Sequence, residues 1–148
     1  MVEPRITRAI RQAVVDRAEG CCEYCWSQAQ YATQSFSVDH IVPRIKGGTN
    51  TSDNLALACQ GCNNYKYNKT EGSDSLNDER VPIYNPRLHR WHEHFVWSAD
   101  FMFILGVTSI GRATVETLKL NRVGVVNLRH ILYRSGEHPP RLVRSARE

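Results

Sequence analysis

The chain has 148 residues, of which 41% are hydrophobic and 23% charged, and its formal net charge is +4. This length suits one domain, and the composition is that of a globular protein rather than a disordered, collagen-like or coiled-coil one. The longest apolar run, residues 101–107, is far shorter than the roughly 20 residues that cross a bilayer, so we expect no membrane association. The charged N-terminus has no apolar signal segment, so we expect reduced cysteines inside a cell.

Charge is distributed unevenly along the chain. Residues 1–79 carry 8 basic and 10 acidic side chains, a net −2, whereas residues 80–148 carry 11 basic and 5 acidic ones, a net +6. An arginine-rich segment suits a polyanionic partner, although a solvated basic surface explains the same charge. We expect residues 80–148 to be a basic extension packed on residues 1–79 within one domain.

The N-terminal segment predicts an amphipathic helix. Apolar residues recur at steps of three and four between residues 6 and 14. Pro4 suits the first turn of such a helix, and Gly20 suits its end. A tight turn at residues 21–25 and a polar loop at residues 27–34 are expected to follow.

Two short strands and a short helix are expected next. Residues 35–41 alternate polar and larger side chains, which predicts a strand that ends before Pro43. A second strand at residues 55–58 follows the turn-rich segment 46–54, so the two strands can form a small hairpin. Residues 62–69 predict a short helix. Asparagine has a low helix propensity, so we expect tertiary contacts to stabilise this helix.

The second half predicts a surface connection, a hairpin and two helices. Residues 71–79 are rich in Gly, Ser, Asp and Asn and indicate a flexible loop. Residues 95–97 and 101–105 predict a hairpin with an aromatic face. Helices are expected at residues 110–120, with Thr108 as a cap, and at residues 121–133.

Four cysteines form two C-x-x-C pairs separated by 33 residues: Cys22 with Cys25, and Cys59 with Cys62. Two such turns can present four thiolates to one tetrahedral zinc ion, which would stabilise a half-chain with little core of its own. Disulfides and a redox-active pair are the alternatives, and the expected intracellular setting disfavours the first. Cys21 is a spare thiol that could compete with Cys22 or simply pack as a small residue.

Asp39 and His40 lie between the two cysteine pairs. They are followed by Gly47-Gly48, by Asn54 and then, directly after Cys62, by Asn63. In this order the residues from Cys22 to Lys69 resemble the HNH endonuclease family. The sequence departs from the family's pattern in having asparagine at the last position, so it reads H-N-N and lacks one nitrogen ligand.

The resemblance implies an α+β fold. Its core would be a ββα-metal unit stapled by a four-cysteine zinc site, with an N-terminal helix and a C-terminal β-hairpin plus helices. The resemblance implies that His40 is the general base and that Asn54 supports it by tying down the loop. Asp39 and Asn63 would hold a catalytic divalent ion, and their hard oxygen ligands favour Mg²⁺ or Mn²⁺. Consecutive strand residues point to opposite faces, so the strand must bend or end at Asp39 and His40.

Five basic residues are candidate phosphate contacts: Arg44, Lys66, Arg112, Arg122 and Arg129. For Arg44 and Lys66 a solvated side chain is an equal alternative. The histidines at positions 89, 92 and 94 lack a firm metal-binding spacing, so we expect no second metal site there. The aromatic residues among them, Trp91, Phe95 and Trp97, look like core residues, and His94 could line the cleft.

The sequence therefore predicts a metal-dependent endonuclease that hydrolyses DNA phosphodiester bonds. By the same resemblance, we expect it to act in the cytoplasm of a bacterium or of a phage-infected host, and to need a homodimer or two events for a double-strand break. A non-catalytic, zinc-stabilised nucleic-acid-binding module is the alternative. A redox or zinc-transfer protein is a third reading, which the surrounding residues do not support.

Overall fold

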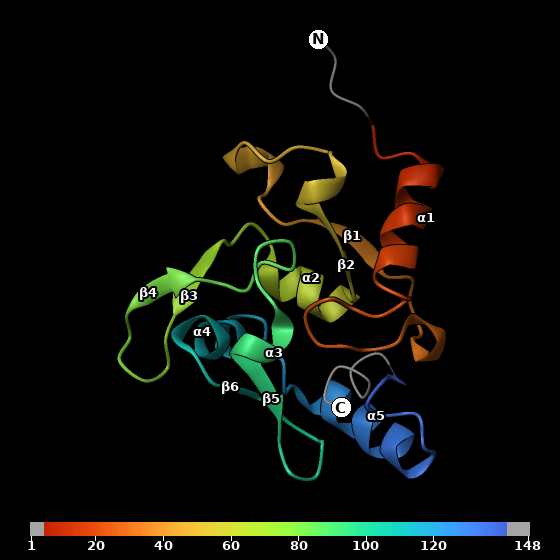
Figure 1. The fold of residues 1–148 in the computed structure, drawn as a ribbon, viewed down its shortest axis with the longest axis vertical. Coiled ribbons are helices and arrows are strands. Elements are labelled where there is room, and N and C mark those ends of the chain that lie inside the picture. Colours follow the sequence, from red (N-terminus) through yellow and green to blue (C-terminus); the bar gives the residue numbers. More distant parts are fainter. Residues whose placement is uncertain (1–4, 142–148) are drawn as a thin grey trace.

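The computed structural model describes residues 5–141, in which short helices alternate with antiparallel strand pairs (Figure 1). The α-helices are α1 (Arg8–Arg17), α2 (Gln60–Lys66), α3 (Trp91–His94), α4 (Ser109–Thr117) and α5 (Val123–Arg134). The strands are β1 (Ser37–His40), β2 (Leu55–Ala58), β3 (Glu71–Ser73), β4 (Arg80–Pro82), β5 (Phe95–Trp97) and β6 (Ile104–Gly106). Three short 3₁₀ helices are η1 (Ala29–Tyr31), η2 (Arg44–Lys46) and η3 (Ser52–Asn54).

Helix α1 begins at a side-chain cap. The Thr7 hydroxyl accepts a hydrogen bond from Ile10 N at 3.1 Å, which satisfies one of the unpaired amides of the first turn. The helix therefore starts later than expected, and Pro4 lies outside the described residues. Val14 is buried, and the Arg17 guanidinium at the other end donates to the carbonyl of Ser52 at 3.0 Å. These contacts hold α1 against the first hairpin.

The predicted hairpin is confirmed. Strands β1 and β2 pair antiparallel from Ser37 opposite Ala58 to His40 opposite Leu55. All four residues of β2 are buried, because the strand lies within the main hydrophobic cluster. Strand β1 is shorter than expected and ends at His40, where the backbone turns toward Pro43.

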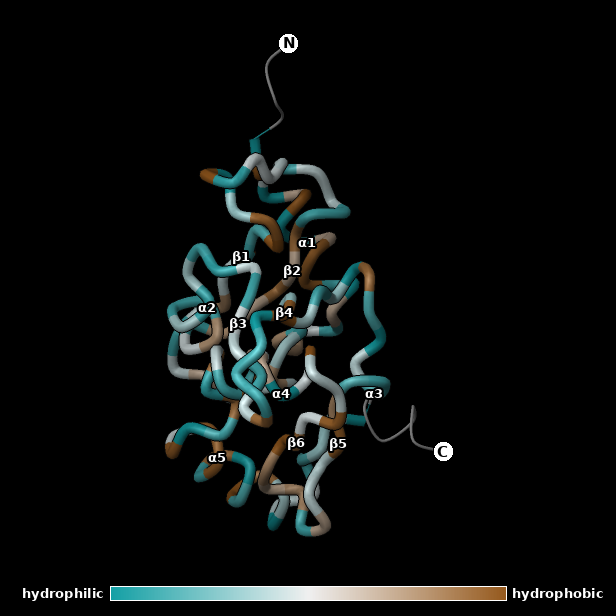
Figure 2. Tube along the Cα trace, turned by 90° about the vertical axis from the view of Figure 1, so that its left-hand side faces the viewer, coloured by the Kyte–Doolittle hydropathy of each residue, from teal (hydrophilic) through white to brown (hydrophobic). Residues whose placement is uncertain are grey.

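Helix α2 consists mostly of polar residues, whereas β5 and β6 are mostly hydrophobic (Figure 2). Of its residues, Cys62 and Lys66 are buried. A seven-residue helix of this composition is too short to be stable alone. As expected, specific tertiary contacts hold it in place, and they involve these two side chains.

The prediction of a loop over residues 71–79 is wrong for residues 71–73, which form β3, whereas residues 75–79 form an exposed turn. Strands β3 and β4 form an antiparallel ladder there, and Asp74 between them is fully buried. The Asp74 carboxylate accepts two hydrogen bonds from Arg112 of α4, at 2.8 and 2.9 Å, and one from Leu76 N. These hydrogen bonds and the Arg112 charge hold the pKa of Asp74 below its usual value. A long-range ion pair thus orders a segment whose composition alone is typical of a loop.

The other C-terminal elements follow the prediction closely. Strands β5 and β6 form the expected hairpin, although β6 begins at Ile104 rather than at residue 101. The Thr108 hydroxyl caps α4 by accepting from Gly111 N at 3.0 Å. Trp91, Phe95 and Trp97 are buried as expected, and Trp91 Nε1 donates to the carbonyl of Tyr24 at 3.0 Å.

One hydrophobic cluster contains residues from both halves, from Val14 to Leu120. Among residues 5–141, we find no helix with the length and hydropathy needed to span a bilayer.

We expect residues 5–141 to unfold as one cooperative unit. Phe95 is fully buried, so Phe95→Ala should lower the free energy of unfolding by about 3–5 kcal/mol. Val96 lies on the exposed face of the same strand, and Val96→Ala should cost less than about 1 kcal/mol. Urea denaturation followed by tryptophan fluorescence and by circular dichroism measures both effects. Two separated transitions in the wild-type protein would show that the halves unfold independently.

Candidate functional site

The four paired cysteines meet at one point. Their Sγ atoms all lie within 4.8 Å of one another, and all four residues are buried. Cys22 and Cys25 come from the turn after α1, whereas Cys59 is the N-cap of α2 and Cys62 lies in its first turn. The Cys25 and Cys59 Sγ atoms are 3.6 Å apart, and all five cysteines are free rather than disulfide-bonded.

This geometry fits zinc. Four thiolates about 2.3 Å from a central zinc ion would be separated by roughly 3.8 Å in a regular tetrahedron. The Cys62 amide also donates to the Cys59 Sγ at 3.5 Å, so the backbone stabilises negative charge on sulfur. Cys21 lies outside the cluster, so it does not compete with Cys22 in this arrangement.

Two arginines predicted to contact DNA serve the protein interior instead. Arg122 Nη2 lies 3.2 Å from the Cys59 Sγ, and Nη1 lies 3.7 Å from the Cys62 Sγ. Burial by itself would lower the pKa of Arg122, but the charge of Cys62 and the other thiolates outweighs it and raises that pKa. Arg129 is buried and donates to the carbonyls of Met102 and Leu120 at 2.9 and 2.7 Å. Both guanidinium groups are therefore committed to structural contacts.

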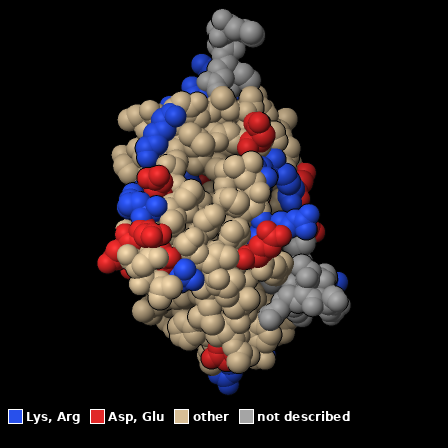
Figure 3. All heavy atoms as spheres, turned by 60° about the vertical axis from the view of Figure 1, so that its left-hand side comes forward, with Lys and Arg blue, Asp and Glu red and all other residues tan. Residues whose placement is uncertain are grey.

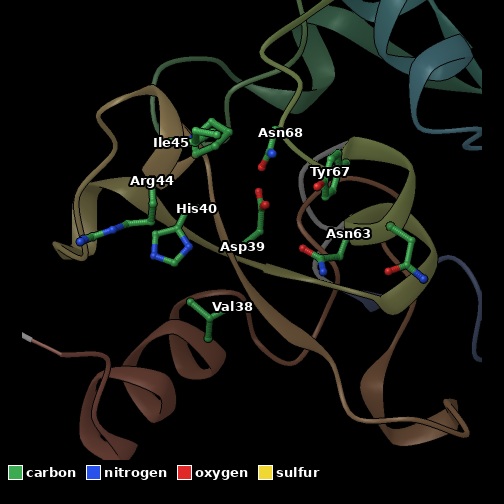
Figure 4. Close-up of a pocket in the computed structure, with 10 residues that line it drawn as sticks. Val38, Asp39, His40, Arg44, Ile45, Asn63, Tyr67 and Asn68 are labelled. Carbon is green, nitrogen blue, oxygen red and sulfur yellow. The ribbon is translucent and has the colours of Figure 1, made fainter.

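A cleft of about 640 Å³ lies between the end of β1 and α2. It is lined by Asp39 and His40 from β1, Asn63 and Asn64 from α2, and neighbouring residues including Arg44 (Figure 4). The strand ends here, which allows a buried Asp39 and a half-exposed His40 to line the same cleft. The structure thus brings together the predicted base and both predicted ligands of the catalytic ion.

Asp39 is held by two buried partners. Tyr24 OH donates to Oδ2 at 2.7 Å, and Lys66 Nζ lies 3.3 Å from Oδ1 and 3.2 Å from Oδ2. Burial raises the pKa of Asp39, and Lys66 and Tyr24 offset part of that rise. Burial likewise lowers the pKa of Lys66, and the Asp39 carboxylate offsets part of that fall. The carboxylate is therefore fixed in direction, with its charge opposed by an ammonium group.

Both expectations for Lys66, a phosphate contact and a solvated side chain, are wrong, because the side chain is buried. Its side chain is 1% exposed, and Nζ also donates to the carbonyls of His40 and Ile41 at 3.0 and 3.1 Å. The ammonium group thus satisfies the carbonyls that the end of β1 leaves without ladder partners. The sequence places Lys66 near Asn63 on one helix, but the burial of Lys66 depends on the tertiary structure.

The orientation of the His40 ring depends on a residue that the sequence did not single out. His40 Nε2 lies 2.7 Å from the Asn50 side-chain oxygen Oδ1. Because an amide oxygen only accepts, Nε2 carries the hydrogen in this arrangement and Nδ1 has the free lone pair. Nδ1 faces the side of the cleft where Asp39 and Asn63 lie (Figure 4). Asn50 belongs to a Gly-Gly-Thr-Asn turn, which in the sequence indicates only a loop.

Asn54 closes the loop that carries Asn50. Its side chain accepts from Val42 N at 2.9 Å and donates to the carbonyls of Val42 and Thr49 at 3.0 and 2.9 Å. Gly48 makes this closure possible, because a Cβ there would lie 1.6 Å from the Val42 carbonyl oxygen. Hydrogen bonds from the Asn54 side chain to the backbone of Val42 and Thr49 thus hold this loop in place.

Of the five basic residues predicted to contact DNA, Arg44 is exposed and lines the cleft. Arg112 forms an ion pair with Asp74. The other four predicted contacts, Arg112, Arg122, Arg129 and Lys66, therefore all make contacts within the protein. Figure 3 shows lysine and arginine side chains interspersed with acidic ones on one face of the molecule, without a continuous basic patch. The basic residues therefore do not form a continuous positively charged surface for DNA on that face.

The histidine-rich segment does not reach the cleft. His94 Nδ1 lies 2.7 Å from the Thr108 hydroxyl, and His89 Nδ1 accepts from Asn85 N at 3.0 Å. The suggestion that His94 lines the cleft is thus not supported, because neither ring is among the residues around it. Within residues 5–141, the groups able to hold a metal by cysteine, histidine or carboxylate ligands reduce to the four-cysteine cluster.

Comparison with known proteins agrees with this geometry. The family model for HNH endonuclease matches residues 22–69, which include both cysteine pairs, the first hairpin and α2. No curated protein matches the chain. The matched residues are about a third of the chain, and they contain His40, Asp39 and Asn63.

We expect one tightly bound zinc ion per chain at the four-cysteine cluster. Structural zinc contributes an apparent binding free energy of about 10–16 kcal/mol, so its removal by a chelator under reducing conditions should unfold the protein. Cys62→Ser should lose zinc, whereas Cys21→Ser should retain it, because Cys21 lies outside the cluster. Elemental analysis and circular dichroism measure the two properties. A folded, zinc-free wild-type protein would contradict the assignment.

Replacing Lys66 should destabilise the protein without displacing zinc. Lys66→Met leaves the buried Asp39 carboxylate without its cation, a change that costs about 3–5 kcal/mol in buried ion pairs. Lys69→Met is the matched control, because Lys69 is exposed. Urea denaturation with zinc quantification separates the two variants. Equal stability of Lys66→Met and Lys69→Met would show that the buried pair contributes no net stability.

Proposed function

We propose that this protein is a metal-dependent endonuclease that hydrolyses DNA phosphodiester bonds. The observation that carries the proposal is that His40, Asp39 and Asn63 line one cleft within the residues that match the HNH endonuclease family. Hydrolysis of a phosphodiester needs an activated water, neutralisation of charge on the phosphoryl oxygens and stabilisation of the leaving oxygen. Each requirement has a candidate group at this cleft.

In this proposal His40 is the general base. A neutral imidazole offers one ring nitrogen that can accept a proton from water. The hydrogen bond from Nε2 to Asn50 keeps the Nδ1 lone pair directed toward the cleft. Nδ1 then removes a proton from a water molecule placed beside the phosphate. Asn50 and Asn54 act as positioning residues, since they hold the ring and its loop.

Asp39 and Asn63 would hold the catalytic cation. A carboxylate and an amide oxygen are hard ligands that leave most coordination positions to water and phosphate, which suits Mg²⁺ or Mn²⁺. When bound, such an ion acts as a Lewis acid on the scissile phosphate and leaving oxygen. Tyr24 and Lys66 fix the Asp39 carboxylate, so its orientation does not depend on the cation. Arg44 at the cleft edge would contact a phosphate of the bound strand.

One such cleft cuts one strand at a time. We therefore propose that the protein nicks DNA and that a double-strand break needs a second chain or a second event.

The decisive change is His40→Ala, which should reduce cleavage of supercoiled plasmid in Mg²⁺ or Mn²⁺ by roughly 10²–10⁴-fold. Asn50→Ala should give an intermediate loss, because the ring remains but its tautomer and direction are no longer held. Both variants should keep their zinc and their fold. The control is His130→Ala, since His130 is an exposed residue of α5 away from the cleft.

Equal cleavage by wild type and His40→Ala would exclude His40 as the base. Salt-sensitive DNA binding without cleavage in any divalent ion would instead identify a non-catalytic, zinc-stabilised binding module.

A further inference from the structure

Two large apolar side chains stand exposed at the rim of the cleft. Ile45 of η2 is 79% exposed, and Tyr67, the residue after α2, is 73% exposed. Both line the cleft, and in Figure 4 they lie on either side of the Asp39 carboxylate. A single exposed apolar residue needs no explanation, but two that flank the site of the proposed chemistry do.

Tyr67 is held in an unusual backbone conformation. Its φ is 48° and its ψ is −118°, a region that residues with a side chain rarely adopt. The conformation is imposed from both sides, because Lys66 is anchored in the core and its carbonyl accepts from Lys69 N at 2.9 Å. Backbone strain of this kind concentrates at functional sites, and here it ends α2 so that the tyrosine projects to the rim.

The remaining rim residues are polar and suited to a nucleobase. Asn64 and Asn68 line the same cleft, and Asn68 lies between Ile45 and Tyr67 in Figure 4. A primary amide both donates and accepts hydrogen bonds, as the edges of bases do. Among the described residues of the lining, the acidic side chain is that of Asp39, and its charge is opposed by Lys66. The rim therefore offers an aromatic face, an aliphatic face and amides, without exposed negative charge.

A ligand that combines a phosphate with a flat apolar face is a nucleotide whose base is not stacked. In duplex DNA the faces of the bases are covered by their neighbours, whereas in single-stranded or unpaired DNA they are open to aromatic side chains. We propose that Ile45 and Tyr67 hold one unpaired base beside the scissile phosphate, so that the protein prefers single-stranded or locally unpaired DNA. This inference rests on the proposed function for the place of the phosphate, but the base contact itself requires no cleavage.

The test is a binding assay with the zinc-loaded full chain and no added catalytic cation. The ligands are a single strand, a duplex with one unpaired nucleotide and a fully paired duplex, each with 2-aminopurine at the tested position and at the same salt concentration. We expect the first two to bind at least tenfold more tightly than the paired duplex and to lose 2-aminopurine fluorescence as the base stacks.

Tyr67→Gly removes the ring and relieves the backbone strain, so it should be at least as stable as the wild type. It should bind the single strand roughly 5- to 100-fold more weakly and leave the fluorescence unquenched. Tyr67→Trp should retain both signals. Leu76→Ala is the matched control, because Leu76 is 74% exposed in the turn between β3 and β4 and does not line the cleft.

Unchanged single-strand affinity of Tyr67→Gly would overturn the inference. Equal or tighter binding of the fully paired duplex would also overturn it, and would favour apolar side chains that wedge between stacked pairs. The two proposals fail separately. If Tyr67→Gly cleaves plasmid and binds the single strand as tightly as the wild type does, the proposed nuclease function stands and the proposed base site is rejected. If single-strand binding depends on Tyr67 but the wild-type protein does not cleave DNA, the proposed base site stands and the proposed nuclease function is rejected.

Discussion

The convergence of four buried thiols is the constraint on which the rest of the structure depends. It brings together the turn after α1, the end of β2 and the start of α2. Helix α2 has seven residues, most of them polar, and a helix of that length gains too little from its own hydrogen bonds to persist. Because the cysteines fix its first turn, Asn63 is held opposite the end of β1. A zinc ion bound by the four thiolates would crosslink these segments and so support one wall of the cleft.

A second constraint is the burial of Lys66, and it connects the cleft floor to its rim. Its ammonium group replaces the strand partners that β1 lacks after His40 and opposes the charge of Asp39. The helix ends directly after Lys66, and Tyr67 follows with a positive φ and an exposed side chain at the rim. The buried Lys66 ammonium group thus holds the direction of the Asp39 carboxylate, a candidate metal ligand, and Lys66 directly precedes the exposed Tyr67.

Three arginines of the basic second half make structural contacts within the protein. Arg122 and Arg129 place positive charge near a cluster that, with zinc bound, would carry two net negative charges. Arg112 serves the buried Asp74 in the same way. An excess of arginine in a sequence is therefore compatible with internal neutralisation as well as with DNA binding, and burial distinguishes the two. Arg44, in the less basic half, is the predicted contact that remains at the cleft.

The sequence by itself predicted the hairpin, α4 with its Thr108 cap, the four-cysteine cluster and the proximity of His40, Asp39 and Asn63. These rest on local signals: alternation along a strand, a capping residue, and motifs within one short segment. It did not determine the β3–β4 ladder, the burial of Lys66, the partners of the arginines, or the roles of Asn50 and Tyr24. Those depend on contacts between residues distant in the chain, such as Asp74 with Arg112 and Tyr24 with Asp39. A polar residue looks the same in a sequence whether water or a buried opposite charge solvates it, and only the tertiary structure decides which one does.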